Sequence, residues 1–207
     1  DAMQAGGVNR ASLGVQTFDP AVQAKVNRIQ PLEMIAWATE ALRAGGAQGL
    51  NFDLMYGLPG QDPASVAQSA ALAAQLRPDR VAVFGYAHVP WFKKHQKMID
   101  DADLADVAGR WDQAQAADEV LTGAGYVRIG LDHYALPGDS LARAAQAGRL
   151  RRNFQGYTVD PAPVLVAMGP SAIGRFAEGM AQNHKATHQW SGAIDAEAAF
   201  DGVRDNK

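Results

Sequence analysis

Residues 51–90 read NFDLMYGLPGQDPASVAQSAALAAQLRPDRVAVFGYAHVP, and this stretch decides the fold class. It begins with an apolar run that ends in a Gly-Leu-Pro-Gly turn. A helix-forming segment follows, opened by Asp62-Pro63 and broken by Pro78, and then a second apolar run. Strand, helix and strand in this order form a βα unit, which builds a parallel sheet or barrel with right-handed crossovers. The sequence therefore predicts an α/β fold.

The residues before this stretch show the same order of an apolar strand segment followed by helical segments. A short apolar segment, ASLGVQTF (Ala11 to Phe18), precedes a short helical segment, AVQAKVNRI, and a longer one, LEMIAWATEALRAGG. The longer segment has apolar residues at helical spacing and stops at Gly45-Gly46. Three expected strands thus alternate with helices, which favours a parallel arrangement.

Beyond Pro90 the pattern changes. The expected elements are a helix over 104–121, a strand and turn over 127–139, a helix over 140–150, a loop over 151–160, a strand and glycine-rich turn over 162–174, and the start of a helix over 193–207. About five strands result in total, too few for a closed eight-stranded barrel.

The composition is that of an ordinary globular protein, with 207 residues, 47% hydrophobic and 20% charged. A net charge of −3 argues against nucleic acid as a partner, because phosphate binding needs a clustered basic face. No apolar run approaches the roughly 18 residues of a membrane helix, and the first ten residues carry no signal-peptide core. We expect a cytoplasmic monomer without a membrane partner. The absence of cysteine excludes disulfides and thiolate-held metals within these residues.

Asp53 is the most informative single position, because it lies mid-strand between apolar residues. Burying a lone carboxylate costs several kcal/mol, so such an aspartate usually has a partner or a ligand. The C-terminal ends of barrel strands form the active-site face, and Asp53 lies just before such an end. Alternatively, its carboxylate reaches solvent at the sheet rim or pairs with an arginine. Gln16 is the matching polar residue on the preceding strand.

Other polar residues have two interpretations each. Arg28 follows the short helix and either clamps a ligand carboxylate or caps the helix end. His88 and His133 each follow or end a strand and are either ligand contacts or hydrogen-bonded residues at the core edge. His184 and His188 have helical metal-ligand spacing, but no third ligand accompanies them, so we expect no metal site.

A basic cluster in GRLRRNFQGY either holds a polycarboxylate or is a solvated helix end. It consists of Arg149, Arg151 and Arg152 with Phe154 and Tyr157. These residues describe a ligand face, but they do not identify a reaction or a catalytic residue.

Six phrases together carry a family resemblance. They are GVNRASLGVQTFDPAVQAKVNR, NFDLMYGLPGQ, PDRVAVFGYAHVPWFKKHQKMID, IGLDHYALPGD, RRNFQGYTV and MGPSAIG. In this order and spacing, from about Gly7 to Asn183, they resemble the oxygen-independent coproporphyrinogen III oxidase family of radical S-adenosylmethionine (SAM) enzymes. The first two phrases contain motifs shared with related radical SAM proteins, including a haem chaperone. YAH-x-P, Q-K-x-I-x-DADL, DH-[YF]-A and RNFQGYT look specific to the oxidases.

The resemblance implies that residues 1–183 are the C-terminal part of a partial (β/α)6 TIM-like radical SAM barrel. It implies that residues 184–207 are the start of a truncated C-terminal helical region. It also implies a [4Fe–4S] cluster on a C-x3-C-x2-C loop and an electron donor of unknown identity. A 5′-deoxyadenosyl radical would take a hydrogen from the propionates of coproporphyrinogen III, and two decarboxylations would give protoporphyrinogen IX in haem biosynthesis. Chemistry borne by a cofactor would explain why the sequence shows no acid–base dyad.

The SAM contacts that the resemblance implies fall on five residues. Gln16 is the glutamine of GVQ, and Arg28, the arginine of VNR, suits a polar end of SAM. Asp53 suits the ribose hydroxyls, while Ala87 of YAH and Ile173 of SAIG suit the adenine or its neighbourhood. On the substrate side, three second-rank candidates remain: His88, His133 and Arg152.

The sequence also departs from the family pattern. The cysteine loop, the glycine-rich SAM segment and the C-terminal domain do not occur in it. We therefore expect a fragment that has no oxidase activity alone. One alternative is a chaperone-like relative that binds haem without turnover, against which RNFQGYT argues. Another is a stand-alone binding module that has lost its cluster.

Overall fold

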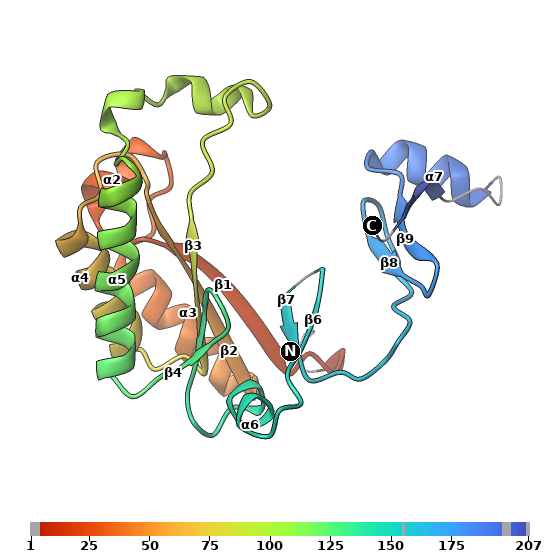
Figure 1. Ribbon diagram of the computed structural model, residues 1–207, viewed down its shortest axis with the longest axis horizontal. Helices are drawn as coiled ribbons and strands as arrows, with labels where there is room; N and C mark the ends of the chain where they lie inside the picture. Colours follow the sequence, from red (N-terminus) through yellow and green to blue (C-terminus); the bar gives the residue numbers. More distant parts are fainter. Residues whose placement is uncertain (1–4, 155, 196–199, 206–207) are drawn as a thin grey trace. The chain divides into compact units, whose positions relative to one another are not determined.

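A computed structural model describes residues 5–154, 156–195 and 200–205 (Figure 1). The chain divides into two compact units, Asp1–Val159 and Asp160–Lys207. The elements of the first unit are β1 (Arg10–Gln16), α2 (Pro20–Lys25), α3 (Leu32–Ala44), β2 (Gly49–Tyr56), α4 (Pro63–Gln75), β3 (Arg80–Gly85), the 3-10 helices η1 (Lys94–Met98) and η2 (Asp101–Asp103), α5 (Val107–Gly123), β4 (Val127–Ile129), β5 (His133–Ala135), α6 (Ser140–Gln146), β6 (Arg151–Asn153) and β7 (Gly156–Thr158).

A five-stranded sheet in the order β1-β2-β3-β5-β4 organises this unit. β1 pairs with β2 and β2 with β3 in parallel, as the alternation of strands and helices predicts. β5 runs antiparallel to both β3 and β4. The α/β fold class is thus confirmed. The single strand expected over 127–139 is wrong, because the chain reverses near Gly130, whose φ of +63° suits a glycine turn, and forms two strands.

The capping of α4 explains why the helix begins where it does. Asp62 Oδ1 accepts a hydrogen bond from the Ser65 backbone N–H at 2.7 Å, and Ser65 Oγ accepts one from the Asp62 N–H at 3.1 Å. Pro63 occupies the first turn, where its missing N–H costs nothing. The hydrogen bond from the Ser65 backbone N–H, followed by one from the Ser65 side chain, lowers the pKa of the Asp62 carboxyl. The Asp-Pro signal in the sequence therefore marks the helix start correctly.

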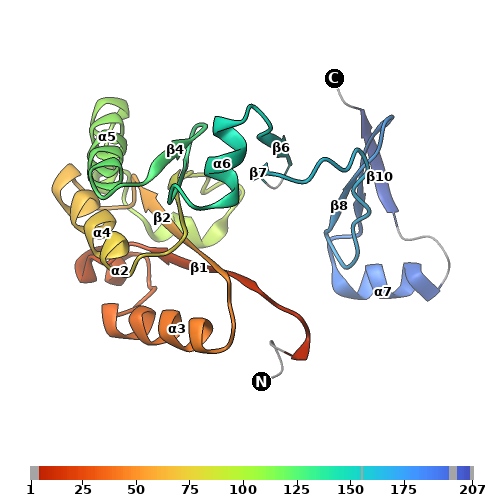
Figure 2. The same ribbon diagram turned by 90° about the horizontal axis from the view of Figure 1, so that it is seen from below.

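One face of the sheet packs against α3, α4 and α5, which lie along the same side of it in Figures 1 and 2. Along α4, Val66, Ala70 and Ala73 recur at helical spacing and are buried. They pack in one core with Phe52 and Leu54 of β2. The other members of this core come from the neighbouring elements and include Val15, Ile35, Val81, Val83, Ala117 and Leu121.

The opposite face of the sheet carries polar side chains, and we call it the site face. It is defined by Ser12, Asn51, Asp53, Ala82 and His133, which neighbour one another in the strand register. Because side chains alternate along a strand, these residues point away from the helices that cover Phe52 and Leu54. The site face is therefore where a ligand can approach the sheet.

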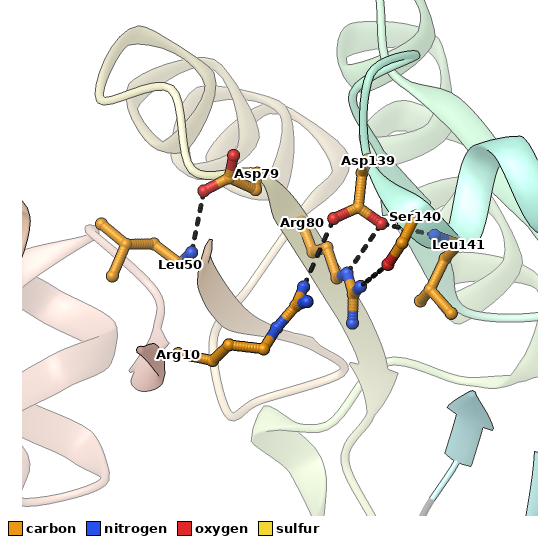
Figure 3. Close-up of polar contacts among 7 residues, drawn as sticks. All are labelled: Arg10, Leu50, Asp79, Arg80, Asp139, Ser140 and Leu141. Carbon is orange, nitrogen blue, oxygen red and sulfur yellow. Dashed lines mark hydrogen bonds and ion pairs between the residues drawn. The ribbon is translucent and has the colours of Figure 1, made fainter. Parts of the chain in front are cut away.

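Asp139 connects the start of α6 to the first residues of β1 and β3, Arg10 and Arg80 (Figure 3). Its carboxylate, 6% exposed, caps α6 by accepting from the Leu141 N–H at 2.7 Å. It also accepts from Arg80 Nε at 3.0 Å and from Arg10 Nη2 at 3.4 Å. Arg80 Nη2 in turn donates to Ser140 Oγ at 3.0 Å. A second contact in the same view, at 2.8 Å, joins the Leu50 N–H to Asp79 on the next strand connection.

The RNFQGYT segment forms an antiparallel pair, β6 with β7, where a loop was expected. Tyr157 anchors this hairpin, since its hydroxyl accepts from the Leu131 N–H at 3.1 Å. The same hydroxyl occupies the space where a side chain at Gly130 would stand. The prediction of a loop was wrong because this anchoring contact joins segments that are distant in sequence.

The second unit contains β8 (Ile173–Arg175), β9 (Gly179–Asn183), α7 (Thr187–Asp195) and β10 (Phe200–Asp205). Its sheet is antiparallel, in the order β10-β9-β8. The strand expected over 162–174 is reduced to β8 and an isolated bridge at Leu165. The helix expected over 193–207 includes only residues 193–195 in α7, while 200–205 pair with β9; residues 196–199 and 206–207 lie outside the described residues.

The division of the chain falls between Val159 and Asp160, earlier in the sequence than the boundary expected after residue 183. The assignment of 184–207 to a separate C-terminal region stays a prediction. None of the helices in the described ranges is long and apolar enough to cross a membrane.

Candidate functional site

Gln16 ends β1 in an unusual backbone conformation. Its φ is +67°, in the left-handed region that residues other than glycine seldom adopt. The register between β1 and β2 is irregular between Gly14 and Gln16. Strained conformations of this kind persist only where the surrounding structure holds them, and they concentrate at functional sites. This feature is not visible in the sequence.

Arg28 folds back onto β1 from the segment after α2. Its Nη2 donates to the Gly14 carbonyl oxygen at 2.7 Å, and its Nε donates to Gln30 Oε1 at 2.6 Å. A Cβ atom at Gly14 would stand 2.7 Å from Gln16 Nε2 and 3.0 Å from Arg28 Nη2. The glycine therefore leaves the space in which both predicted site residues lie. Arg28 is therefore hydrogen-bonded to β1. A cation that only caps the end of the helix would not make this contact.

Asp53 lies beside this group on β2, in register with Gly14. Its Oδ2 accepts from Ser12 Oγ at 3.1 Å and its Oδ1 from Asn51 Nδ2 at 2.7 Å. Asn51 Nδ2 also donates to Ser12 Oγ at 2.8 Å. The carboxylate is thus oriented by two neutral donors, Ser12 and Asn51. The ion pair with an arginine, one of the alternatives from the sequence, is not among these contacts. Each carboxylate oxygen keeps a free lone pair for a further donor.

Asn51 adds a feature that sequence reasoning missed. Its Oδ1 is buried and has no hydrogen-bond partner in the part of the chain that the structure describes. Buried acceptors without a partner are rare in native proteins and call for a ligand, a water or another segment. The only signal in the sequence is the polar residue two places before Asp53, which shares its strand face.

A cavity of about 500 Å³ opens at the C-terminal ends of the strands, beside Gln16 and Arg28. Its wall combines these two polar side chains with apolar ones, among them Met55, Tyr86 and Ile99. Cavities of this size with a few placed polar groups are typical of small-molecule sites. Burial raises the pKa of Tyr86, whose hydroxyl lies 3.2 Å from His88 Nδ1.

The Gly-Leu-Pro-Gly turn next to this cavity is fixed by two glutamines that sequence reasoning did not single out. Gln113 of α5, 1% exposed, accepts from the Gly57 N–H at 2.7 Å and donates to the Gln61 carbonyl at 2.8 Å. Gln61 Oε1 accepts from the Leu58 N–H at 2.8 Å. These hydrogen bonds fix the conformation of the turn, which contributes Leu58 to the cavity wall. The turn does not have the spacing of a phosphate-binding loop.

Ala87 follows β3 and is exposed. Its carbonyl accepts from Gln96 Nε2 at 3.1 Å, and Gln96 itself lines the cavity. His88 lies between two partners, 3.2 Å from the Tyr86 hydroxyl and 3.0 Å from Asp101. The structure thus places Ala87 on the segment that borders the cavity, and it supports the hydrogen-bonded interpretation of His88.

Ile173 belongs to β8 of the second unit. Its contribution to the same site as the other four residues stays a prediction. Gln16 and Arg28 are brought together at Gly14, Asp53 is the register partner of Gly14 on β2, and Ala87 lies on a segment hydrogen-bonded to Gln96 of the same cavity. No group of three or more potential metal-ligating side chains occurs within the described ranges.

Comparison with known proteins gives close relatives, although no family model matches the chain. The chain is 52% identical over 196 residues to the oxygen-independent coproporphyrinogen III oxidase of Bradyrhizobium diazoefficiens, covering 95% of this chain and 44% of that protein. It is 51% identical over 187 residues to the enzyme of the same name from Paracoccus denitrificans, covering 90% and 42%.

Among solved structures, coproporphyrinogen III oxidase (HemN) from Escherichia coli, described as a radical SAM enzyme, superposes with a TM-score of 0.90 at 43% identity. The match covers 95% of this chain and 45% of that one. Sequence and fold therefore identify the chain as a homologue of the oxygen-independent coproporphyrinogen III oxidases. It spans slightly less than half the length of these relatives.

Proposed function

We propose that this chain is part of an oxygen-independent coproporphyrinogen III oxidase of haem biosynthesis. In that enzyme it would supply much of the wall that contacts SAM. The observation that carries the proposal is the convergence of Gln16, Arg28 and Asp53 around Gly14. Gln16 and Arg28 both lie against Gly14 and line a cavity large enough for a small-molecule cofactor, and Asp53 is in register with Gly14 on the neighbouring strand.

The chemistry of these residues fits SAM. The oriented carboxylate of Asp53 would accept hydrogen bonds from the two ribose hydroxyls, because both of its oxygens keep a lone pair. The guanidinium of Arg28 would hold a carboxylate, which is the charged end of the methionyl group. The amide of Gln16 and the segment around Ala87 would complete the polar contacts. Ile173 would add an apolar contact to the adenine.

The [4Fe–4S] cluster does not fit the residues of this chain, since its usual ligands are cysteine thiolates and the sequence has none. Its ligands would come from outside these 207 residues. When present, the cluster and SAM together supply a hydrogen-abstracting radical. The residues described here would bind and orient SAM next to coproporphyrinogen III and limit the access of water. We expect the isolated chain to hold no cluster and to show no turnover.

We further propose a cytoplasmic, monomeric protein that receives electrons from a donor of unknown identity and uses neither nucleic acid nor membrane as partner. The net charge of −3 supports the first exclusion, because it offers no excess of basic residues for phosphate.

Turnover by the whole protein tests the proposed function. Under anaerobic conditions, with SAM and a chemical reductant, coproporphyrinogen III should lose two carboxyl groups and give protoporphyrinogen IX. Stoichiometric haem binding without any decarboxylation would instead support the chaperone-like alternative and contradict the proposal. The isolated 207-residue chain, reconstituted with iron and sulfide, is the matched negative control. A cluster absorbance band from that sample would show that the account of the ligands is wrong.

A further inference from the structure

His133 lies in the same row of the site face as Asp53. Across the sheet, Asp53 is in register with Ala82 on β3, and Ala82 is in register with His133 on β5. Two strand spacings separate the histidine from the aspartate, about 10 Å at the backbone. Tyr134, the next residue on β5, points the other way and donates to Asp118 of α5 at 2.7 Å. His133 therefore faces the space that the proposed SAM contact also faces.

The ring of His133 is fixed in orientation by Asp132. Its Nδ1 lies 2.7 Å from Asp132 Oδ1, and because an ionised carboxylate only accepts, Nδ1 carries the hydrogen. The ring also makes edge-on contacts with Phe84, 5.8 Å between ring centroids, and with Tyr157, at 5.4 Å. Nε2 has no hydrogen-bond partner among the described residues, although the side chain is only 17% exposed.

The β6–β7 hairpin brings a guanidinium to the same aromatic ring. Arg152 lies over Tyr157, with its Cζ 5.5 Å from the ring centroid. Gly156, on the opposite strand of the hairpin, presents no side chain toward His133. A Cβ atom there would be 3.9 Å from both Cε1 and Nε2 of the imidazole. Tyr157 thus connects an oriented imidazole and a cation, and the space next to Nε2 is left open by a glycine.

We propose that His133 and Arg152 form a carboxylate-binding subsite that holds one propionate of the tetrapyrrole substrate. Since Nδ1 already carries a hydrogen toward Asp132, Nε2 donates only in the doubly protonated imidazolium form, and in that form the ring and the Arg152 guanidinium together are a suitable anion clamp. Phe84 and Tyr157 give the neighbouring apolar surface that a pyrrole ring requires. The inference rests on the proposed function, and it assigns a role to the RNFQGYT segment that the SAM contacts leave unexplained.

The two residues have structural alternatives that the test must separate. His133 is a ring packed at a sheet edge, and Arg152 is an exposed cation on a hairpin. In that case both would stabilise the hairpin without meeting substrate. A structural role would change folding and SAM affinity together with substrate affinity. A subsite would change the affinity for the substrate carboxylates alone.

The experiment uses the full-length protein with His133→Gln, Arg152→Gln and, as matched control, Arg143→Gln, an exposed arginine on α6 outside the basic cluster. We expect the first two variants to raise the KM for coproporphyrinogen III by about tenfold, as loss of a charged hydrogen bond does. The Kd for SAM should change less than twofold in all three. Arg152→Lys should recover part of the loss, because it keeps the charge.

Binding of the oxidised ligand keeps the proposal testable if turnover is too slow. Coproporphyrin III should bind the His133→Gln and Arg152→Gln variants more weakly than wild type, and its tetramethyl ester, which lacks the charges, should bind all proteins equally. Unchanged affinity for coproporphyrin III in both variants would overturn the subsite. A wild-type protein without any decarboxylation would instead remove the proposed function, and the subsite with it.

Discussion

The side-chain nitrogen of Asn51 lies 2.7 Å from Oδ1 of Asp53, two residues further along the same strand. Residues two apart on a strand lie on the same face, so this contact requires only the geometry of β2. Ser12 of β1 completes it by donating to the other carboxylate oxygen at 3.1 Å. Asp53 therefore presents a fixed carboxylate to the site face before any ligand arrives. Preorganisation of this kind lowers the entropy that binding has to overcome.

Asn51→Ala should weaken SAM binding by the full-length protein roughly tenfold, because one orienting hydrogen bond is lost and Asp53 gains freedom. Asn51→Asp should weaken it further, since two carboxylates would then face each other. Asn9→Ala, at an exposed asparagine outside the site, is the control. Titration calorimetry measures the effect, and equal affinities for Asn51→Ala and wild type would contradict the orienting role.

Gly14→Ala should separate ligand binding from stability. Gly14 does not have a positive φ, so alanine suits the strand and should leave the free energy of unfolding unchanged or higher by a few tenths of a kcal/mol. The new Cβ would meet Gln16 Nε2 at 2.7 Å and displace it together with Arg28, so SAM affinity should fall at least tenfold. Gly123→Ala, where no atom lies within 4 Å of the added carbon, is the control. A parallel loss of stability and affinity would argue against a steric effect on the site.

Asp139→Ala should be among the most destabilising single substitutions in the first unit. It leaves Arg80 without its carboxylate partner and removes the cap of α6, and breaking a buried pair costs about 3–5 kcal/mol. Asp103→Ala breaks the exposed pair with Lys25, whose two side chains are 44% and 42% exposed, and should cost about 0–1 kcal/mol. Urea unfolding curves compare the two. Similar midpoints for both variants would show that the Asp139 contacts contribute little.

Stability should fall in alkaline solution between about pH 10 and 12. Burial, reinforced by the hydrogen bond to Asp118, raises the pKa of Tyr134 to about 12, and burial raises that of Tyr126 to about 12. In the unfolded chain both hydroxyls ionise near 10, so the unfolded state binds fewer protons in this interval and is favoured as the pH rises. Unfolding midpoints measured across the interval should decline, and Tyr134→Phe should make the decline shallower. A flat profile in wild type would contradict the assignment.

Much of this organisation could be predicted from local sequence. Asp62-Pro63 fixes the start of α4, and the alternation of apolar runs and helices fixes three parallel strands. The sequence also places Gln16 and Asp53 at matching positions on successive strands, and the C-terminal ends of parallel strands share one edge. Their strand segments indeed pair in the structure.

The remainder depends on register and on distant contacts, which single-sequence patterns do not contain. Ser12 was not singled out because its contact to Asp53 depends on how β1 aligns with β2. The β6–β7 hairpin was missed because Tyr157 secures it against the β4–β5 turn. The helix predicted over residues 200–205 is wrong because their pairing with β9 overrides the local helical propensity.

The proposed SAM site depends above all on the Asp53 carboxylate. Its most direct test is calorimetric titration of SAM into the full-length protein and its Asp53→Ala and Asp112→Ala variants, the latter removing an exposed carboxylate on α5. We expect Asp53→Ala to weaken the affinity for SAM by tenfold or more, and Asp112→Ala to match wild type. An Asp53→Ala variant that folds normally and binds SAM as tightly as wild type would contradict this expectation.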